Sequence, residues 1–355
     1  MTEQQHHNLR VAIAGQGFGE RVILPCLSAV DGLEVTAWVS RQPDAVIDRL
    51  APLGIGQAFG SIDDLIRSDA ADILCIATPP TTHAGMAIPF LEAGKSVICE
   101  KPLAASLADA EAMAQAAERA RGFAIVDHQL RFHPCLARIR DLIAADAIGR
   151  PVYVDLSYKT ATRLDPAKPG WNWWSDRQQS GGQLFALGSH MLDLMQWWFG
   201  GITRVTANLA RSYDQRTGPD GPVDVTTDDV AMALLEFESG LPAMMNVSSV
   251  DADEPMMRLR VAGTEGVIDY VWDERLVLHR RGGGTEDHTA EDEILGAPGY
   301  GENAWRAALV RLGRAVAASD GGQPETAATF QEALRTQRVL EAIRRAADER
   351  AWINI

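Results

Sequence analysis

The first 126 residues alternate short apolar runs with longer helix-like segments, and this alternation restricts the chain to few folds. Short apolar runs are typical of buried strands, and the segments between them have the composition and end signals of helices. Strands separated by helices predict a parallel sheet with helices on both faces. The expected strands are Leu9–Ala14, Leu33–Val39, Ile73–Ala77, Ser96–Cys99 and Phe123–Val126, and the expected helices are Glu20–Val30, Asp44–Leu50, Ile62–Ser68, Thr82–Ala93 and Ser106–Arg121.

The pattern changes after a helix expected over Pro134–Ala145. In the segment that follows, Val154, Leu156 and Tyr158 alternate with polar residues, which is typical of a sheet with one covered face. A run of such segments predicts an α+β second domain built on an open, mainly antiparallel sheet. Its further strands are expected at 205–209, 229–237, 242–250, 258–262, 267–272 and 276–279, its helices at 188–199, 303–318 and 326–350, and exposed loops at Asp214–Asp224 and Gly282–Gly301.

Composition limits the class of protein and its partners. The chain has 355 residues, enough for two domains, and its 46% hydrophobic and 23% charged residues are typical of a soluble globular protein. A net charge of −15 without a Lys/Arg run argues against nucleic acid or a membrane surface as a partner. The scattered cysteines and polar N-terminus predict no metal site, a reducing compartment and a cytoplasmic location.

A glycine-rich turn, Gly15-Gln16-Gly17-Phe18-Gly19, separates the first expected strand from the first expected helix. Glycines permit positive φ and a close backbone approach, and the free N–H groups of the helix attract a pyrophosphate. The third glycine of the usual dinucleotide-binding pattern would stand at Glu20, so Gly19 lies one place early. The position between strand and helix nevertheless indicates a dinucleotide site.

The end of the second expected strand indicates which dinucleotide is bound. NAD-binding proteins usually carry a carboxylate there for the ribose hydroxyls, but this strand ends in Ser40 and Arg41. A serine and an arginine can hold a 2′-phosphate, which predicts that NADP is preferred and that NAD is a weaker alternative. Arg41 could instead be an ordinary surface arginine.

Four more segments, together with the glycine turn, are similar to the Gfo/Idh/MocA oxidoreductases, the family of glucose–fructose oxidoreductase and inositol dehydrogenase. These segments are Ala77-Thr78-Pro79-Pro80-Thr81-Thr82-His83, Glu100-Lys101-Pro102, Gly181-Gly182 with Gly188-Ser189-His190-Met191-Leu192-Asp193, and Ala262–Ile268. The resemblance implies a Rossmann domain over residues 1–127. It also implies an α+β domain with a large open sheet over 128–355, whose C-terminal helices pack back on the first domain. It further implies a homodimer or homotetramer formed through that sheet.

The resemblance also implies roles for single residues. Thr78 and Pro79 would line the cofactor cleft, and His83 would lie near the phosphates or the nicotinamide. Glu100 would belong to the cofactor site and Lys101 would stand beside the nicotinamide, with the Lys101–Pro102 peptide in the cis form. Lys101 could alternatively be held in a structural salt bridge.

Oxidation of an alcohol needs a base near the hydroxyl, and the pKa of histidine suits this task. The helix expected over residues 188–199 places His190 and Asp193 on one face. We therefore expect Lys101, His190 and Asp193 to be catalytic, with Lys101 and His190 meeting over one nicotinamide. A structural histidine and a solvated aspartate are the alternatives.

Substrate contacts are expected from the start of the second domain and from a tryptophan cluster. His128 and Arg131 follow the last expected strand of the first domain, and Trp173 and Trp174 could stack on a sugar ring. Structural packing is the alternative for all four residues. Ala186 stands where sugar dehydrogenases of the family commonly have an aspartate, four residues before the histidine.

Together these features predict an NAD(P)-dependent oxidoreductase that transfers a hydride between nicotinamide and a hydroxyl or carbonyl group of a small sugar or polyol. Two alternatives stay open. One is an enzyme that cleaves glycosides by transient oxidation and retains its cofactor. The other is a nucleotide-binding regulator without catalysis.

Overall fold

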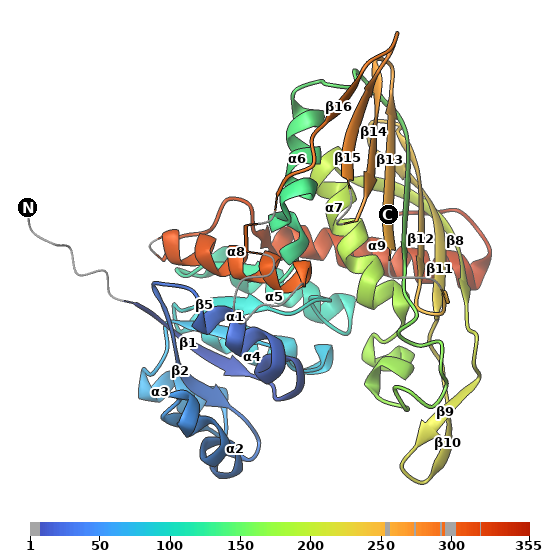
Figure 1. Ribbon diagram of the computed structural model, residues 1–355. Helices are drawn as coiled ribbons and strands as arrows, with labels where there is room; N and C mark the ends of the chain where they lie inside the picture. The colour runs from blue at the N-terminus through green and yellow to red at the C-terminus, as the bar shows by residue number, and fades with distance from the viewer. Residues whose placement is uncertain (1–7, 253–255, 273–274, 292, 295–302, 320) are drawn as a thin grey trace, which may run out of the picture. The chain divides into compact units, whose positions relative to one another are not determined.

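The computed structural model describes residues 8–252, 256–272, 275–291, 293–294, 303–319 and 321–355 (Figure 1). The chain forms two compact units. The first comprises Met1–His133 and Asp292–Leu334, and the second comprises Pro134–Glu291 and Arg335–Ile355. Each unit therefore contains two separate stretches of the chain. The division into domains at residues 127 and 128, with C-terminal helices that pack back on the first domain, stays a prediction.

A seven-stranded sheet, in the order β17-β6-β5-β4-β1-β2-β3, forms the centre of the first unit. Every strand pair is parallel except the one between β17 and β6. The sheet therefore has the doubly wound order expected of a dinucleotide-binding domain. The strands are β1 (Leu9–Ala14), β2 (Leu33–Val39), β3 (Gln57–Phe59), β4 (Ile73–Ile76), β5 (Ser96–Cys99), β6 (Ala124–Val126) and β17 (Ala328–Thr329).

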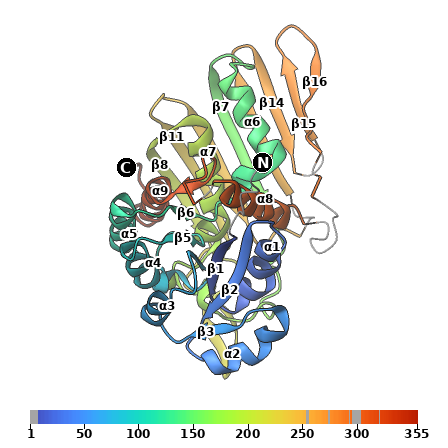
Figure 2. The same cartoon turned by 90° about the vertical axis from the view of Figure 1, so that its left-hand side faces the viewer.

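Helices cover both faces of this sheet, as the alternating pattern predicted (Figure 2). One buried cluster joins the sheet to α3, α4, α5 and the start of α9, and a second cluster joins it to α1, α2 and α8. The helices are α1 (Leu24–Ser28), α2 (Pro43–Leu50), α3 (Ile62–Ser68), α4 (His83–Glu92), α5 (Leu107–Arg119), α8 (Ala304–Ala318) and α9 (Phe330–Glu349), which continues into the second unit.

The second unit is built on a nine-stranded sheet in the order β16-β15-β14-β13-β7-β12-β11-β8-β18. All its strand pairs are antiparallel except β7 and β12. Residues such as Leu156, Leu235 and Met245 are buried on one face, along which α6 (Pro134–Ala144) and α7 (Ser189–Phe199) lie (Figure 1). The strands are β7 (Pro151–Lys159), β8 (Ile202–Ala210), β11 (Val230–Phe237), β12 (Pro242–Ser248), β13 (Met256–Gly263), β14 (Gly266–Val271), β15 (Arg275–Arg280), β16 (Thr285–Asp287) and β18 (Ile353–Asn354).

The expectation of two exposed loops was wrong in part. Residues 214–224 contain a two-stranded hairpin of β9 (Gln215–Gly218) and β10 (Gly221–Asp224). Its strands are short and carry turn residues, so they show no alternating pattern. The second segment contains β16, an exposed edge strand that pairs only with β15, while residues 292 and 295–301 lie outside the described part of the chain.

Candidate functional site

The glycine turn is held against the end of β4 in the first unit. Gly15 has φ +116°, and a Cβ atom built there would lie 2.3 Å from the carbonyl oxygen of Ala77. No L side chain fits that position without a backbone shift. Gly17 differs, because its added Cβ would meet nothing closer than the Arg21 guanidinium at 3.9 Å. The fold therefore requires glycine at position 15. At position 17 the fold has room for a larger residue, so a glycine there is explained instead by the close approach of a phosphate.

Gly19 accounts for the departure from the usual glycine spacing. A Cβ there would lie 3.2 Å from Cγ2 of Ile13, so this glycine lets the helix pack closely on β1. The helical segment begins with a wide π turn over Gly19–Ile23 and continues as α1. Phe18 is 40% exposed at the open side of the turn. Gly19 therefore fulfils the packing role that the usual pattern assigns to the next position.

Ser40 and Arg41 lie beside the glycine turn. The hydroxyl of Ser40 accepts hydrogen bonds from Nε2 of Gln16 at 3.2 Å and from the backbone N–H of Gln42 at 3.1 Å. The first bond joins the turn to the end of β2. Arg41 is exposed and makes no ion pair or hydrogen bond within the described residues. Its guanidinium is therefore available to an anion.

His83 lies beside Thr78 in the loop after β4, and its place near the cofactor stays a prediction. Its ring is fully buried, with Nδ1 3.1 Å from the carbonyl oxygen of Leu103 and Nε2 2.9 Å from that of Thr78. Burial lowers the pKa of His83, which favours the neutral ring. The nitrogen that carries the proton in the neutral ring donates to its carbonyl, and only the charged ring would donate to both. Because a backbone carbonyl faces each nitrogen, His83 links the loops after β4 and β5.

Glu100 and Lys101 follow β5 at the carboxyl edge of the parallel sheet, where such sheets bind their ligands. The Lys101–Pro102 peptide is cis, and the Lys101 backbone N–H donates to Oε2 of Glu100 at 3.2 Å. Burial lowers the pKa of the Lys101 ammonium, although Glu100 and Asp127 oppose that effect. An amine with a lowered pKa is suited to exchanging a proton near neutrality.

Asp127 is a further candidate residue at this edge of the parallel sheet, and it was not predicted from the sequence. It is 1% exposed and directly follows β6. Burial, together with the neighbouring Glu100, raises the pKa of Asp127 well above its usual value, and burial also raises that of Glu100. Its position after a buried strand, at the same sheet edge as Glu100, was the available signal.

The two substrate candidates next to β6 are both buried. His128 is 3% and Arg131 is 2% exposed, and Nη1 of Arg131 forms an ion pair with Glu332 at 3.0 Å. This ion pair favours the structural alternative for Arg131. A substrate contact by either residue stays a prediction.

In the second unit, two glycines position the helix that carries His190 and Asp193. A Cβ on Gly181 would lie 2.1 Å from the carbonyl oxygen of Trp174, and one on Gly182, which has φ +98°, would lie 2.4 Å from Oδ1 of Asp228. Oδ2 of Asp228 accepts the backbone N–H of Leu184 at 2.8 Å. Asp228, which the sequence reasoning missed, therefore anchors the start of this helical segment.

The segment opens with a π turn over Leu184–Gly188, which contains Ala186, and continues as α7. His190 is 2% and Asp193 is 1% exposed. The solvated alternative for Asp193 is therefore wrong. Burial raises the pKa of the nearby Asp228 to about 6.

The tryptophan cluster packs within the second unit. The rings of Trp173 and Trp174 stack with centroids 6.5 Å apart, and the Arg163 guanidinium lies 5.5 Å from the Trp174 ring centre. Arg163 is buried and pairs with Asp229 at 3.7 Å. Both tryptophans are half-buried, so each keeps a surface that a ligand could contact.

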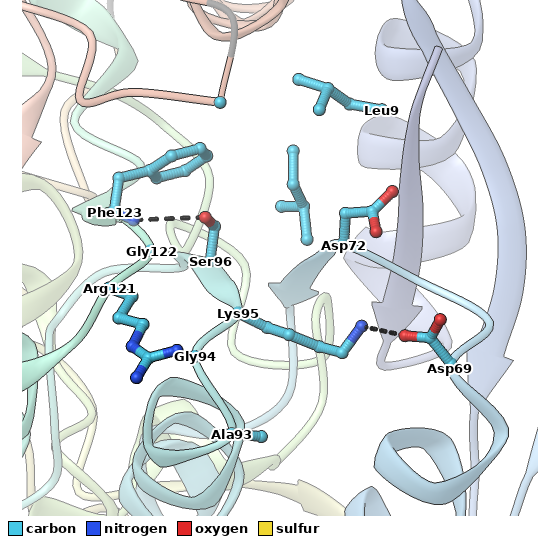
Figure 3. A pocket seen from close by; sticks show the side chains of 12 residues that line it. Leu9, Asp69, Asp72, Ala93, Gly94, Lys95, Ser96, Arg121, Gly122 and Phe123 are labelled. Atoms are coloured by element: carbon cyan, nitrogen blue, oxygen red, sulfur yellow. Dashed lines mark hydrogen bonds and ion pairs between the residues drawn. The ribbon is translucent and has the colours of Figure 1, made fainter. Parts of the chain in front are cut away.

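A cavity of about 470 Å³ lies at the opposite edge of the parallel sheet (Figure 3). Leu9, Ile73 and Ser96, which begin β1, β4 and β5, line it together with Lys95 and Asp69, which pair at 2.6 Å. Parallel sheets bind nucleotides at their carboxyl edge, so this cavity is not the candidate cofactor site.

Among the described residues, every helix is too short or too polar to cross a lipid bilayer.

Comparison with known proteins assigns the chain to a family. Residues 9–128 match the NAD-binding Rossmann fold of an oxidoreductase family, and residues 140–355 match the C-terminal alpha/beta domain of the same family. D-apiose dehydrogenase of Paraburkholderia graminis is 31% identical over 347 residues, which cover 93% of this chain and 85% of that protein.

Solved structures agree with this assignment. An NAD binding oxidoreductase from Klebsiella pneumoniae has a TM-score of 0.86 at 26% identity, covering 98% of this chain and 99% of that one. Levoglucosan dehydrogenase in complex with NADH and L-sorbose has the same fold, with a TM-score of 0.86 at 21% identity and the same coverage. The chain belongs to the Gfo/Idh/MocA family and is an NAD-binding oxidoreductase.

Proposed function

We propose that the protein is a dehydrogenase that prefers NADP and acts on a hydroxyl or carbonyl group of a sugar or polyol. The observation that carries this proposal is the position of Lys101. It follows β5 at the edge where the glycine turn follows β1, and burial lowers its pKa. A proton-exchanging amine beside a pyrophosphate-binding turn is what a nicotinamide-dependent dehydrogenase needs.

The chain's own residues supply binding and proton transfer. A bound nicotinamide supplies the hydride acceptor or donor. Gly15, Gly17, Phe18 and Gly19 form the turn for the pyrophosphate, and the loop of Thr78 and Pro79 borders the same edge.

Lys101 hydrogen-bonds the oxygen of the reacting carbon. In oxidation the single hydroxyl proton passes to the neutral Lys101 amine and from there to His190, the proposed base, and in reduction it returns by the same route. Asp193, one helical turn after His190, orients that imidazole or a substrate hydroxyl. Both side chains belong to α7 of the second unit.

The preference for NADP rests on Ser40 and Arg41. An exposed arginine without a protein partner is suited to pair with a 2′-phosphate and to stack on adenine. A carboxylate at the end of β2 would repel that phosphate, and β2 ends without one. The NADH complex of levoglucosan dehydrogenase keeps NAD as the alternative cofactor.

The substrate class rests on relatives. D-apiose dehydrogenase and levoglucosan dehydrogenase are named for sugars or sugar derivatives. The half-buried Trp173 and Trp174 supply aromatic faces of the kind that stack on sugar rings.

Fluorescence titration with NADPH and NADH, followed by a screen of aldoses, inositols and keto-sugars, tests the proposal. We expect tighter NADPH binding and turnover with at least one sugar. Tight binding without any turnover would instead support the regulator. Product formation without a net change in nicotinamide absorbance would support glycoside cleavage with a retained cofactor.

We also propose that a second copy of the chain covers the outer face of the nine-stranded sheet. Leu234 and Met244 are cross-strand neighbours on that face and are 48% and 43% exposed, and Met232 and Tyr153 add 44% and 42% exposed side chains. Adjacent apolar side chains on a sheet face are typical of an interface. Light scattering should find a dimer or tetramer, and Leu234→Lys should shift it toward the monomer. A wild-type monomer would contradict the proposal.

A further inference from the structure

Two buried carboxyl groups lie side by side at the carboxyl edge of the parallel sheet. Cys99 of β5 is the register partner of Val126 of β6, and Glu100 and Asp127 are the next residues of these strands. The Asp127 backbone N–H donates to the Cys99 carbonyl at 2.8 Å, which extends the pairing to Asp127. Glu100 is 9% and Asp127 is 1% exposed.

Most of their oxygens lack a donor. Within the described residues, Oε1 of Glu100 and both carboxyl oxygens of Asp127 have no hydrogen-bond partner at good geometry, and solvent does not reach them. The backbone N–H of Gln129 lies near the Asp127 carboxyl and favours its charged form, but burial and Glu100 outweigh that effect. The two carboxyls are close enough to hydrogen-bond to each other once one of them holds a proton. Two bare carboxylates in this place would repel each other without water to screen them.

Among the charged groups of the described residues that act on the pair, Lys101 is the cation that acts on both carboxyls. The buried ring of His128 directly follows Asp127 in the chain. Three thiols also lie close to the carboxyls. Burial and the carboxyls raise the pKa of Cys75 and Cys99, and Cys26, which faces Asp127 and Arg306, has a pKa raised to about 12, so all three stay neutral.

We propose that Glu100 and Asp127 share one proton and together present a single negative charge to Lys101. The shared proton joins one oxygen of each carboxyl by a hydrogen bond and removes the repulsion between two negative charges. The consequence for Lys101 rests on the proposed function. One opposing charge permits the ammonium to release its proton to the reaction, whereas two charges would hold that proton on the nitrogen. Glu100 and Asp127 are positioning residues in this arrangement.

Infrared spectroscopy tests the shared proton directly, without substrate or cofactor. A protonated carboxyl has a C=O stretch that is separate from the carboxylate bands. We expect this band in the native protein at pH 8 and its loss in either Glu100→Gln or Asp127→Asn. In each variant an amide donates to the remaining carboxylate, so the proton is no longer needed. Asp228→Asn is the matched control, because Asp228, with a pKa of about 6, is already ionised at pH 8.

The outcomes separate this inference from the proposed function. Absence of the band in the native protein would overturn the shared proton even if the enzyme turns over. Loss of the band in only one variant would place the proton on a single carboxyl and would also overturn it. If a variant fails to fold, the native protein still decides, because the band must disappear when urea unfolds the chain at the same pH. Presence of the band in an inactive protein would leave the pair intact and refute the dehydrogenase instead.

Discussion

Substitution of Gly15 by alanine should destabilise the first unit and disrupt the cofactor turn. The new Cβ would lie 2.3 Å from the Ala77 carbonyl oxygen, about 1 Å inside ordinary contact, and Gly15 has φ +116°. Backbone strain at such a position costs about 1–3 kcal/mol, and overpacking costs about 1–3 kcal/mol more. We therefore expect the free energy of unfolding to fall by about 3 kcal/mol. The fall will be smaller if the loop at Ala77 moves away from the new methyl group.

Gly17→Ala is the matched control for this prediction. Its Cβ would meet only the flexible end of Arg21 at 3.9 Å, and Gly17 does not have a positive φ. We expect a stability within about 1 kcal/mol of the wild type but NADPH binding at least about tenfold weaker, because the methyl group would occupy the approach of the pyrophosphate. Urea denaturation and fluorescence titration measure the two effects. Equal stabilities of the Gly15→Ala variant and the wild type would refute the geometric argument, and unchanged affinity of the Gly17→Ala variant would refute the pyrophosphate site.

Three further predictions follow from single side chains. Arg41→Ala should weaken NADPH binding about tenfold and leave NADH binding nearly unchanged, and equal losses for both cofactors would count against the 2′-phosphate contact. Arg131→Met should lower the free energy of unfolding by about 2 kcal/mol, because it removes the buried partner of a partly buried ion pair with Glu332; an unchanged denaturation midpoint with a raised KM would favour the substrate role. Asp228 has a pKa raised from 3.8 to about 6, so its neutral form stabilises the fold at low pH and that contribution is lost as the pH rises through 6. Between pH 4 and pH 7 the free energy of unfolding of the wild type should fall by at most about 3 kcal/mol more than that of Asp228→Asn. Equal pH dependence of the two proteins would show that the pKa of Asp228 is not raised.

The sequence predicted the parallel sheet because its strands are continuous apolar runs between capped helices. Ser61 and Ser106 accept the N–H groups of Asp64 and Asp109, as N-caps should, and Gly94 ends α4 with φ +80°. The hairpin of β9 and β10 was missed because its short strands carry turn residues. These elements owe their form to pairing partners rather than to local preference.

The sequence offered two grounds for naming candidate site residues. Glycines in the turn and His190 could be selected for their own chemistry, and Lys101 was selected through the family resemblance. Asp127 and Asp228 could not, because their importance depends on which residue the register or a helix start places beside them. The contacts of His83 could not be predicted either, since only the fold shows that a backbone carbonyl faces each nitrogen of its ring.

The central claim is that Lys101 and His190 serve the same hydride transfer, and single-turnover kinetics tests it most directly. The cofactor-loaded enzyme is mixed with a substrate found in the sugar screen, and the change in nicotinamide absorbance is followed. We expect Lys101→Ala and His190→Ala each to slow this change by about 10²–10⁴-fold, with cofactor affinity unchanged. Lys159 and His279, which pair with Asp251 and Asp269 on the outer face of the nine-stranded sheet, supply matched controls for residue type, and their alanine variants should react at the wild-type rate. A wild-type rate of hydride transfer in either the Lys101 or the His190 variant would contradict the account.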